Sequence, residues 1–481
     1  MKIKGLILLI LLQALETYSQ SQDQNIAIFC KIWGFLKYYH PTVATGKIDW
    51  DNEFINRVIP VSEMNDKTAI SNYYLRWIDE LGKIDPCKKC TDTLPGSIRF
   101  NYNVDWLKDS SVFTNTLMHR LEYIRLNRNQ GKNYYTPVVN VFGFKAASPN
   151  YKTEKPYPDA VYPSPPVRLL TLSRYWNIIN YFYPYKYCIG KDWDSILSEK
   201  ISQFKNAADT LSYHLAIRDL ISSINDTHAG VFFTPYLLQE LGTKMPPFIF
   251  EIIDHKAVVT GSYNDSLTGR DDIQYGDIIT KLNGEPLETI INERGKYISA
   301  SNEDCRIRDV KGILLLGKED SVSVTIDRNG LVMEKIIHRY DFRRWNLFHT
   351  PKDDDAKRPA WEIRADNIGY VNLGNLDPGK VKKMMQDLLP AKAIIFDIRN
   401  YPKSVYPAIA KYLNTERKPF VRASMPNINF PGIYTFSKLM YAGTKNKLVY
   451  KGRVILLMDE RTQSMAEFTV MALQTAPNVT T

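Results

Sequence analysis

The chain has 481 residues, and its 62 lysines and arginines against 52 aspartates and glutamates give a formal net charge of +10. The basic residues are spread along the chain and form no long block, so this charge does not indicate a nucleic-acid partner. An apolar content of 44% is typical of a globular protein, and the length allows about three domains.

Residues 1–20 have the pattern of a secretory signal peptide. Lys2 and Lys4 precede the apolar run Gly5–Leu15, which is too short to span a bilayer comfortably, and cleavage is expected near Ser19–Ser21. No cysteine directly follows the run, so a bacterial lipoprotein anchor is not expected. We predict an exported protein without a membrane span after signal removal, located in the periplasm, on the cell surface or in the medium of a bacterium.

The chain contains five cysteines, and their odd number leaves at least one thiol free or paired between chains. Cys87 and Cys90 form a C-x-x-C motif. In an exported chain this spacing favours a structural disulfide, with a redox pair or half of a metal site as alternatives. A zinc site needs a second ligand pair, which is not evident nearby, so neither a metal nor another cofactor is predicted. The remaining cysteines are Cys30, Cys188 and Cys305.

An aromatic helical pattern occurs twice. A helix is expected over Ile26–Tyr39, ended by His40-Pro41, and its run Trp33–Pro41 is echoed by Trp176–Pro184. The Asp-Trp-Asp sequence at 49–51 is echoed at 192–194 with the same shift of 143 residues. Two copies are too few for a solenoid. We therefore predict a duplicated helical module, one copy degenerate, whose aromatic side chains pack in the core.

A proline-rich stretch, 157–167, separates the two copies and is predicted to be a linker. The second copy continues through helices over Trp193–Phe204 and Leu211–Ile224 and ends at a polar turn that contains Thr227 and His228. A histidine at the end of a helix can simply interact with the last carbonyls of that helix. It can also serve as a general base, and the residue types alone leave both interpretations open.

Residues 246–338 have the pattern of a small β-domain. The dipeptide Asn283-Gly284 is typical of a tight hairpin turn. Short strands are expected at Phe248–Ile253, Ala257–Val259, Ile278–Leu282 and Val322–Ile326.

Strands and helices alternate after residue 359, which favours an α/β core. Strands are expected at Trp361–Ile363, Gly369–Leu373 and Ala393–Ile398, and a helix is expected over Pro378–Leu389.

The stretch Arg453–Leu473 joins a strand to a helix. Its apolar run Val454–Met458 is too short for a helix and is bounded by charged residues, so we expect a buried strand. The helical pattern starts at Ser464, where the unpaired N–H groups and partial positive charge of a helix N-terminus favour a developing oxyanion. Ser464 and Glu467 also match a capping box, so a structural N-cap is the alternative to a nucleophile.

The sequence M-D-E-R-T-Q-S-M-A-E around Ser464 resembles the nucleophile segment of the tail-specific (C-terminal-processing) serine peptidases and of the related tricorn core. The resemblance places the nucleophile at Ser464 and one oxyanion donor at the backbone N–H of Met465. It extends to the Asp-Thr-His turn of the second helical module, where it makes His228 the general base and Thr227 the residue that orients it.

Two further segments carry the resemblance. The run Gly276–Gly284 is similar to the G-D-x-I-x-x-(I/L)-N-G core of a PDZ domain, a fold that binds extended peptides by adding a strand. The turn Asp397–Pro402 looks like the D-L-R-x-N-x-G-G turn whose glycine N–H helps form the oxyanion hole of these peptidases. Lys403 and Ser404 stand where the two glycines belong, so an oxyanion donor from these positions carries a steric cost if the turn is left-handed.

These features predict a multidomain α+β protein with helical N-terminal modules, a PDZ-like β-domain and an α/β (ClpP/crotonase-like) peptidase core. The resemblance also implies residues beyond Thr481, so the core is expected to be incomplete in this chain. The predicted domains are 21–156 (helical and mixed module), 168–243 (helical module with His228), 244–342 (PDZ-like domain) and 355–481 (core).

The predicted function is that of an exported serine endopeptidase that cleaves protein or peptide substrates, bound in part through the PDZ-like domain. In one branch of the family a lysine after the serine replaces histidine as the base, and that position lies past Thr481. The main alternative is a non-catalytic, PDZ-like peptide-binding scaffold, favoured by Lys403 and Ser404. A thiol redox protein built on Cys87 and Cys90 lacks a thioredoxin-like βαβ context.

Overall fold

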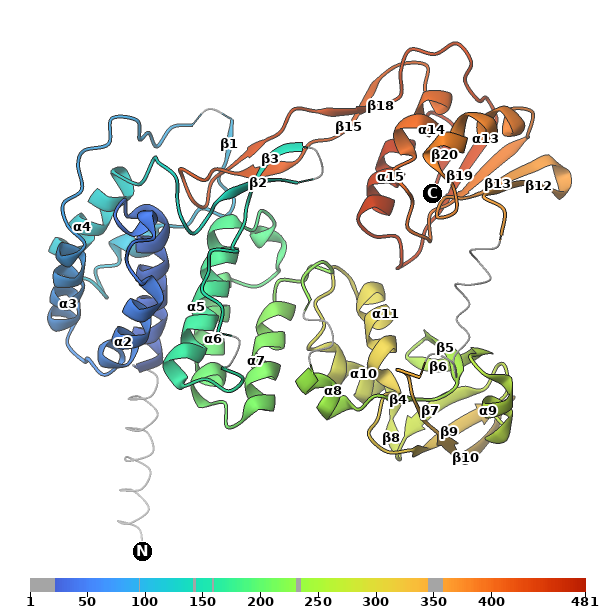
Figure 1. The fold of residues 1–481 in the computed structure, drawn as a ribbon, viewed down its shortest axis with the longest axis horizontal. Coiled ribbons are helices and arrows are strands. Elements are labelled where there is room, and N and C mark those ends of the chain that lie inside the picture. Colours follow the sequence, from blue (N-terminus) through green and yellow to red (C-terminus); the bar gives the residue numbers. More distant parts are fainter. Residues whose placement is uncertain (1–21, 95, 142–143, 158–159, 231–234, 345–357) are drawn as a thin grey trace, which may run out of the picture. The chain divides into compact units, whose positions relative to one another are not determined.

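The computed structural model describes residues 22–94, 96–141, 144–157, 160–230, 235–344 and 358–481 (Figure 1). The predicted signal peptide lies outside these residues. The chain divides into two compact units, Met1–Ile224 with Ala423–Ser437, and Asn225–Arg422 with Lys438–Thr481. Within the described ranges, no helix has both the length and the apolar character needed to cross a membrane.

The first unit contains the same three-helix module twice. Four aspartates cap helices by accepting a hydrogen bond from a backbone N–H three residues later: Asp49, Asp66, Asp192 and Asp209. Asp49 corresponds to Asp192 and Asp66 to Asp209, with the same shift of 143 residues that the sequence shows. The first module consists of a helix over 22–39, α2 (Trp50–Ser62) and α3 (Lys67–Glu80), and the second of α5 (Pro165–Phe182), α6 (Trp193–Asn206) and α7 (Thr210–Ser222).

A pair of reciprocal indole hydrogen bonds closes each module. The Trp33 indole donates to the Trp50 carbonyl (2.8 Å) and the Trp50 indole to the Trp33 carbonyl (3.2 Å). Trp176 and Trp193 repeat this arrangement at 2.8 and 3.0 Å. All four side chains are buried, so the aromatic residues of the repeat pack in the core as predicted.

The two modules pack against each other through equivalent positions. Lys31 of the first module forms an ion pair with Asp194 of the second (2.8 Å), and Arg174, the equivalent of Lys31, pairs with Asp51, the equivalent of Asp194. Such an exchange of partners is what a local two-fold relation between the copies produces. Between the two modules, the buried side chain of Asn177 also donates a hydrogen bond to the carbonyl of Cys30 (3.0 Å).

Replacing Gly34, the equivalent of Asn177, with alanine is expected to lower the free energy of unfolding by about 1–3 kcal/mol. A Cβ atom at Gly34 would overlap the Asn177 side chain, which is buried and hydrogen-bonded and so has little room to move. Urea denaturation of the two proteins measures the difference. Gly131→Ala is the control, because its nearest neighbour stands at an ordinary contact distance of 3.5 Å, and an equal loss in that variant would contradict the explanation.

The stretch predicted as a linker is shorter than expected. Pro165 and Pro166 belong to the first turn of α5, where proline loses no intrahelical hydrogen bond and its fixed φ suits the helix. The rest of the first unit includes η1 (Val43–Thr45), β1 (Ser97–Ile98), η2 (Asp105–Lys108), α4 (Asn115–Leu126), the paired strands β2 (Val138–Val141) and β3 (Phe144–Pro149), and η3 (Lys186–Cys188).

A hairpin that the sequence places in the peptidase core belongs to the first unit. Its strands β16 (Ser424–Pro426) and β17 (Tyr434–Phe436) pair with each other, and β17 pairs with β1. The Tyr39 hydroxyl donates to the Pro431 carbonyl (2.8 Å), and the Arg128 guanidinium lies 3.6 Å from the ring centre of Phe430. These long-range contacts explain why residues 423–437 leave the domain in which their neighbours lie.

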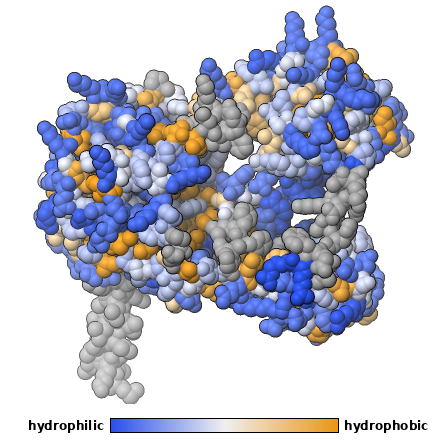
Figure 2. Space-filling model, in the orientation of Figure 1, coloured by the Kyte–Doolittle hydropathy of each residue, from blue (hydrophilic) through white to orange (hydrophobic). Residues whose placement is uncertain are grey.

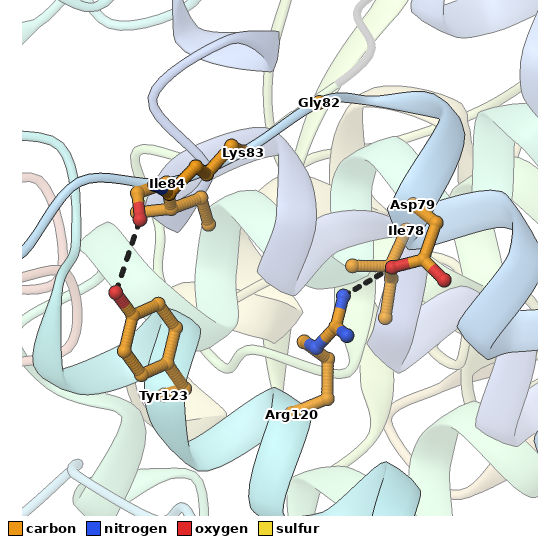
Figure 3. A pocket seen from close by; sticks show the side chains of 7 residues that line it. All are labelled: Ile78, Asp79, Gly82, Lys83, Ile84, Arg120 and Tyr123. Atoms are coloured by element: carbon orange, nitrogen blue, oxygen red, sulfur yellow. Dashed lines mark hydrogen bonds and ion pairs between the residues drawn. The ribbon is translucent and has the colours of Figure 1, made fainter.

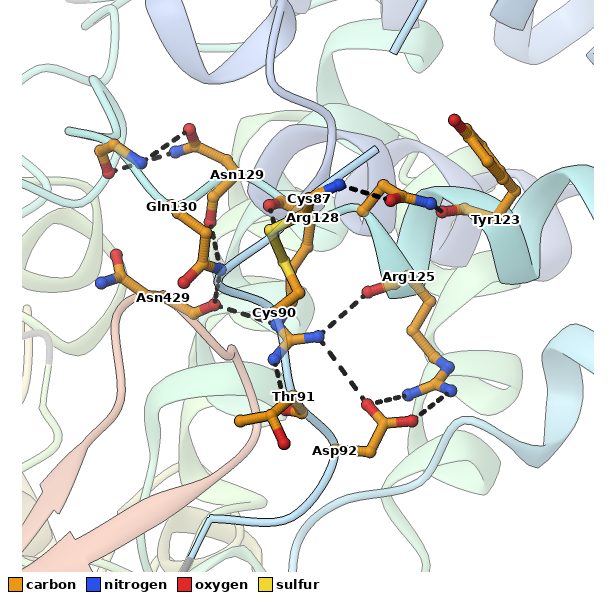
Figure 4. Close-up of a disulfide and its surroundings, with 12 residues drawn as sticks. Cys87, Cys90, Thr91, Asp92, Tyr123, Arg125, Arg128, Asn129, Gln130 and Asn429 are labelled. Atoms are coloured by element: carbon orange, nitrogen blue, oxygen red, sulfur yellow. Dashed lines mark hydrogen bonds and ion pairs between the residues drawn. A yellow bond between two sulfur atoms is a disulfide. The ribbon is translucent and has the colours of Figure 1, made fainter. Parts of the chain in front are cut away.

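Figure 4 shows the disulfide between Cys87 and Cys90, which confirms the pairing favoured by the sequence. The Arg128 guanidinium beside it donates to the carbonyls of Thr91 (2.8 Å) and Asn429 (3.1 Å). The disulfide loop therefore helps to hold the hairpin in place.

The second unit begins with a β-domain. Its sheet has the order β10-β9-β7-β6-β5, with β8 also paired to β7. Asn283 and Gly284 both have positive φ and join β7 to β8, as expected for an Asn-Gly hairpin. The elements are α8 (Pro235–Leu241), β4 (Lys244–Met245), β5 (Phe248–Ile253), β6 (Lys256–Ser262), α9 (Asp265–Arg270), β7 (Ile278–Leu282), β8 (Glu285–Pro286), α10 (Leu287–Gly295), α11 (Glu303–Leu314), β9 (Ser321–Arg328), β10 (Leu331–His338) and β11 (Tyr340–Asp341).

The other part of this unit is the expected α/β core, a five-stranded sheet of order β12-β13-β14-β19-β20. All neighbouring strands except β12 and β13 run parallel. Apolar side chains of α13, α14 and α15 bury its strands. The elements are β12 (Trp361–Arg364), η5 (Ala365–Asn367), β13 (Ile368–Asn372), η6 (Pro378–Lys380), α13 (Val381–Leu388), β14 (Ala393–Asp397), α14 (Tyr406–Leu413), β15 (Lys418–Val421), β18 (Met440–Ala442), β19 (Arg453–Leu457), α15 (Met465–Leu473) and β20 (Val479–Thr480).

The described residues therefore form a mixed helix-and-sheet protein. On the face shown in Figure 2, exposed apolar side chains lie as separate spots among hydrophilic ones. Isolated exposed apolar residues are ordinary on protein surfaces and do not mark an interface by themselves.

Candidate active site

The turn that carries Ser464 lies at the carboxyl edge of the parallel sheet. Strands β14 and β19 are parallel neighbours in a register that aligns Asp397 with Leu457, so the turns that follow them leave the same edge. The Thr462 hydroxyl donates to the Ile398 carbonyl (3.1 Å), which ties the second turn to the end of the first strand. In α/β sheets this edge is where ligands bind.

Ser464 has an unusual backbone conformation, with φ 59° and ψ −113°. An ordinary N-cap residue is extended. The other residues that cap helices through a side-chain hydrogen bond here all have negative φ; they are Asp49, Asp66, Asp192, Asp209, Asn264 and Asn302. A serine in a strained turn between a strand and a helix is instead typical of a nucleophile elbow.

The helix N-terminus at Ser464 offers backbone donors. The Ser464 N–H donates to the Glu467 carboxylate (2.7 Å), and the capping box predicted from the sequence is present. In the described part of the chain, nothing accepts a hydrogen bond from the Met465 N–H. That group lies at the first helical position and is available to an oxyanion.

His228 lies in a turn just after α7, held by hydrogen bonds to a distant segment. The Thr227 hydroxyl donates to Ser301 Oγ (3.0 Å) and accepts from the Ser301 N–H (2.9 Å). The Asp226 N–H donates to Ser299 Oγ (3.1 Å). Because the Thr227 hydroxyl makes these two hydrogen bonds, it holds the backbone of the turn. No sequence pattern indicated Ser299 or Ser301, which lie more than 70 positions away.

The carboxylate of Asp226 is the acidic group beside His228. Its Oδ1 atom accepts from the His228 N–H (2.8 Å) and lies 3.4 Å from Nδ1 of the imidazole. The side chain of His228 is 58% exposed, so the ring is open to solvent and to a ligand. The signal for Asp226 in the sequence is its position two residues before the histidine.

A pocket of about 610 Å³ brings the two parts of the candidate site together. Its walls include Thr227, His228 and Ser301 as well as Ser464 and Glu467. Its remaining lining includes apolar side chains and the thiol of Cys305, whose Sγ lies 3.6 Å from the Glu460 carbonyl. Ser464 and His228, which are 236 positions apart in the sequence, thus line one cavity.

The turn with Lys403 and Ser404 does not line this pocket. Ser404 has φ 52°, so the left-handed conformation considered from the sequence is present at a residue with a Cβ atom. The Lys403 ammonium forms an ion pair with Asp377 (2.7 Å), and both side chains are about half exposed. Ser404 therefore adopts a backbone conformation that suits glycine, but it carries a Cβ atom that glycine lacks.

The start of the same turn is held by a buried carboxylate, that of Asp397. The Asp397 carboxylate accepts two hydrogen bonds from the Arg399 guanidinium (2.9 and 2.7 Å) and one from the Tyr370 hydroxyl (2.6 Å). Burial raises the pKa of Asp397, but these hydrogen bonds outweigh burial and hold the pKa below its usual range. The carboxylate remains charged and fixes the beginning of the turn.

The first helical module carries no equivalent site. The position equivalent to His228 is Asp85, and the residues described around the nearby pocket of about 460 Å³ in Figure 3 include no serine, histidine or cysteine. Its shape is held by the Tyr123 hydroxyl, which donates to the Ile84 carbonyl (3.0 Å), and by the ion pair of Arg120 with Asp79. Among the described residues there is no cluster of metal-binding side chains.

No family model matches the chain, and no curated protein does. Solved structures similar to it include mature CPAF complexed with lactacystin (12% identity, TM-score 0.46, covering 65% of this chain and 83% of that one). The photosystem II D1 C-terminal processing protease is another (15% identity, TM-score 0.33, 65% and 79%). A putative S41 protease from Bacteroides fragilis NCTC 9343 is a third (14% identity, TM-score 0.23, 54% and 74%). Similarity this distant identifies neither the activity nor the site residues of this chain.

Proposed function

We propose that this protein is an exported serine endopeptidase of the tail-specific type, with Ser464 as nucleophile and His228 as general base. The observation that carries the proposal is the strained backbone of Ser464 at a helix N-terminus, in a pocket that His228 also lines. A structural N-cap needs neither the positive φ nor an imidazole that lines the same pocket.

The geometry suggests how the residues divide the work. Because Asp226 lies beside Nδ1 of His228, the other ring nitrogen, Nε2, takes the proton of the Ser464 hydroxyl as its oxygen attacks the peptide carbonyl. The Met465 N–H donates to the oxyanion of the tetrahedral intermediate. His228 then gives the proton to the leaving amine, and water releases the acyl group by the same steps in reverse.

The supporting residues have defined parts in this mechanism. Thr227 positions His228 indirectly, by fixing the turn against Ser301. The backbone of Lys403 or Ser404 is the proposed source of a second oxyanion donor, by resemblance to the glycine turn of the tail-specific peptidases. No step needs a cofactor.

We further propose that the β-domain is PDZ-like and binds the substrate. Strand β5 is at the edge of its sheet, pairing with β6 alone among the described strands, and can accept an extended peptide as an added strand. A cavity of about 720 Å³ lies between this strand and α11 and is lined by Glu251, Ile253, Ile307 and Arg308, among others. The Arg308 guanidinium also donates to the Glu460 carbonyl (2.6 Å), next to the nucleophile turn.

One observation favours a second function, that of a non-catalytic peptide-binding scaffold. The turn with Lys403 and Ser404 stays outside the pocket of Ser464, and Ser404 occupies a conformation that glycine adopts more easily. A scaffold would keep the β5 edge but would have no activated serine.

The test is labelling of the signal-free protein with a fluorophosphonate, which reacts with activated serines. The wild-type protein is expected to be labelled, and the Ser464→Ala variant is expected to give no labelling. Ser198→Ala, an exposed serine on α6, is the control and is expected to react like the wild type. Absence of labelling in folded wild-type protein, or labelling that survives in Ser464→Ala, would reject the peptidase and favour the scaffold.

A further inference from the structure

Equivalent surfaces of the two helical modules differ in whether another segment of the chain covers them. In the first module this surface is built by Trp33, Lys37, Asp49, Trp50 and Asp51, and in the second by the equivalent residues Trp176, Asn180, Asp192, Trp193 and Asp194. A segment of the chain covers the first surface. In the second module, the corresponding residues line an open cavity of about 390 Å³ beside α5 and α6.

The segment on the first surface is Glu154–Tyr157, which belongs to no helix or strand. The Glu154 carboxylate forms a buried ion pair with the Lys37 ammonium (2.5 Å), which lies 4.5 Å from the ring centre of Trp33. The next residue, Lys155, is 3.6 Å from the Asp49 carboxylate, and the Tyr157 hydroxyl donates to Asp51 (3.2 Å). Each polar side chain of this surface therefore has a partner in the segment.

The cavity of the second module also presents an ammonium group. Lys186, from η3, donates from Nζ to Oδ1 of Asn180 (2.6 Å), the residue equivalent to Lys37. In the described part of the chain no carboxylate lies within ion-pair distance of this ammonium. Burial lowers the pKa of Lys186 to about 8, and the more distant carboxylates of Asp194 and Asp192 oppose this shift. The difference from the first module is geometric, because Glu154 pairs directly with Lys37.

Aromatic side chains at the cavity mouth are unusually exposed. Phe100 is 74% and Tyr187 is 57% exposed, and their ring centres are 5.3 Å apart. Both line the cavity, with Trp106 and the indoles of the second module. A ligand with an apolar or aromatic group would cover these rings and so bury apolar surface.

We propose that this cavity is a docking site for an extended peptide segment with an acidic side chain followed, within three residues, by an aromatic one. The acidic group binds the Lys186 ammonium and the aromatic ring packs on Phe100 and Tyr187. A basic residue after the acidic one pairs with Asp192, as Lys155 pairs with Asp49. The contacts of Glu154 and Lys155 on the first surface thus show how the acidic and basic residues of a peptide would bind the second.

The test uses a synthetic peptide with the sequence of residues 151–157, Y-K-T-E-K-P-Y, titrated into the Ser464→Ala protein by isothermal calorimetry. This variant cannot hydrolyse the peptide if Ser464 is the nucleophile, and binding itself does not depend on peptidase activity. We expect one peptide per chain, because the first surface already holds its own covalently attached segment, which acts at a high effective concentration.

Removing the ammonium should weaken this binding by about 10- to 100-fold in Lys186→Ala, the loss expected for a charge-assisted hydrogen bond. A peptide with glutamine in place of its glutamate should lose a similar factor. Lys191→Ala is the matched control, since Lys191 lines the same cavity but already pairs with Glu199 (2.7 Å) at the surface, and it should change affinity less than about threefold. Equal affinity of the two lysine variants, indifference to the glutamate, or no binding of the peptide at about 1 mM would overturn the proposal.

Discussion

Replacement of His228 by alanine is expected to reduce the second-order rate constant of fluorophosphonate labelling at Ser464 by about 10⁴-fold. The serine hydroxyl is a poor nucleophile until a neighbouring base removes its proton. His228 is the imidazole that lines the pocket of Ser464, and Asp226 lies beside its Nδ1 atom. The rate is measured from labelling time courses, with circular dichroism showing that the variant is folded.

The matched control is His338→Ala. His338 also pairs with an aspartate, Asp271, at 2.6 Å, but it does not line the pocket of Ser464. The His338→Ala substitution should change the labelling rate less than about threefold, because it removes a histidine–aspartate pair that lies outside the pocket of Ser464. If the His228→Ala variant is labelled at the wild-type rate and the Ser464→Ala variant is not labelled, Ser464 is the nucleophile but His228 is not its base.

Replacement of Glu154 by glutamine is expected to lower the free energy of unfolding by about 3–5 kcal/mol. The change leaves the fully buried Lys37 ammonium without its carboxylate. Burial already lowers the pKa of Lys37, and Glu154 opposes this by stabilising the charged form. Chemical denaturation measures the loss, provided that the unfolding of the first unit is followed through its buried tryptophans.

Two controls separate this effect from a general loss of charge. Lys155→Ala breaks the exposed ion pair with Asp49 and should cost less than about 1 kcal/mol. The double variant Lys37→Met, Glu154→Leu removes both buried charges and should recover most of the loss, since an apolar pair of similar volume avoids the desolvation penalty. A single Glu154→Gln variant as stable as the wild type would show that the buried pair contributes nothing net.

Local patterns in the sequence predicted much of the secondary structure. Apolar runs flanked by turn residues located β5 and β7 with their observed ends, Phe248–Ile253 and Ile278–Leu282. The repeated Trp and Asp positions predicted the two modules, and Asn283-Gly284 predicted the turn between β7 and β8. These features depend on residues close in sequence, whose hydrophobic period and backbone preferences act in any tertiary context.

The sequence also located a serine between a strand and a helix, but it could not decide between a cap and a nucleophile. Both interpretations use the same residues, Ser464 and Glu467. The positive φ of Ser464 favours the nucleophile, and that angle depends on how β19 and α15 pack in the sheet, which periodicity does not encode.

The tertiary structure alone decided the remaining features. Ser301 holds Thr227 across 74 positions, and Glu154 covers Lys37 across 117. The hairpin at 423–437 joins the first unit by pairing β17 with β1. Such contacts depend on how the helices and strands pack together, because packing decides which of their surfaces become buried. The sequence by itself therefore determined the elements, the duplication and the candidate nucleophile, whereas the packing of distant segments determined what surrounds His228 and which module keeps an open cavity.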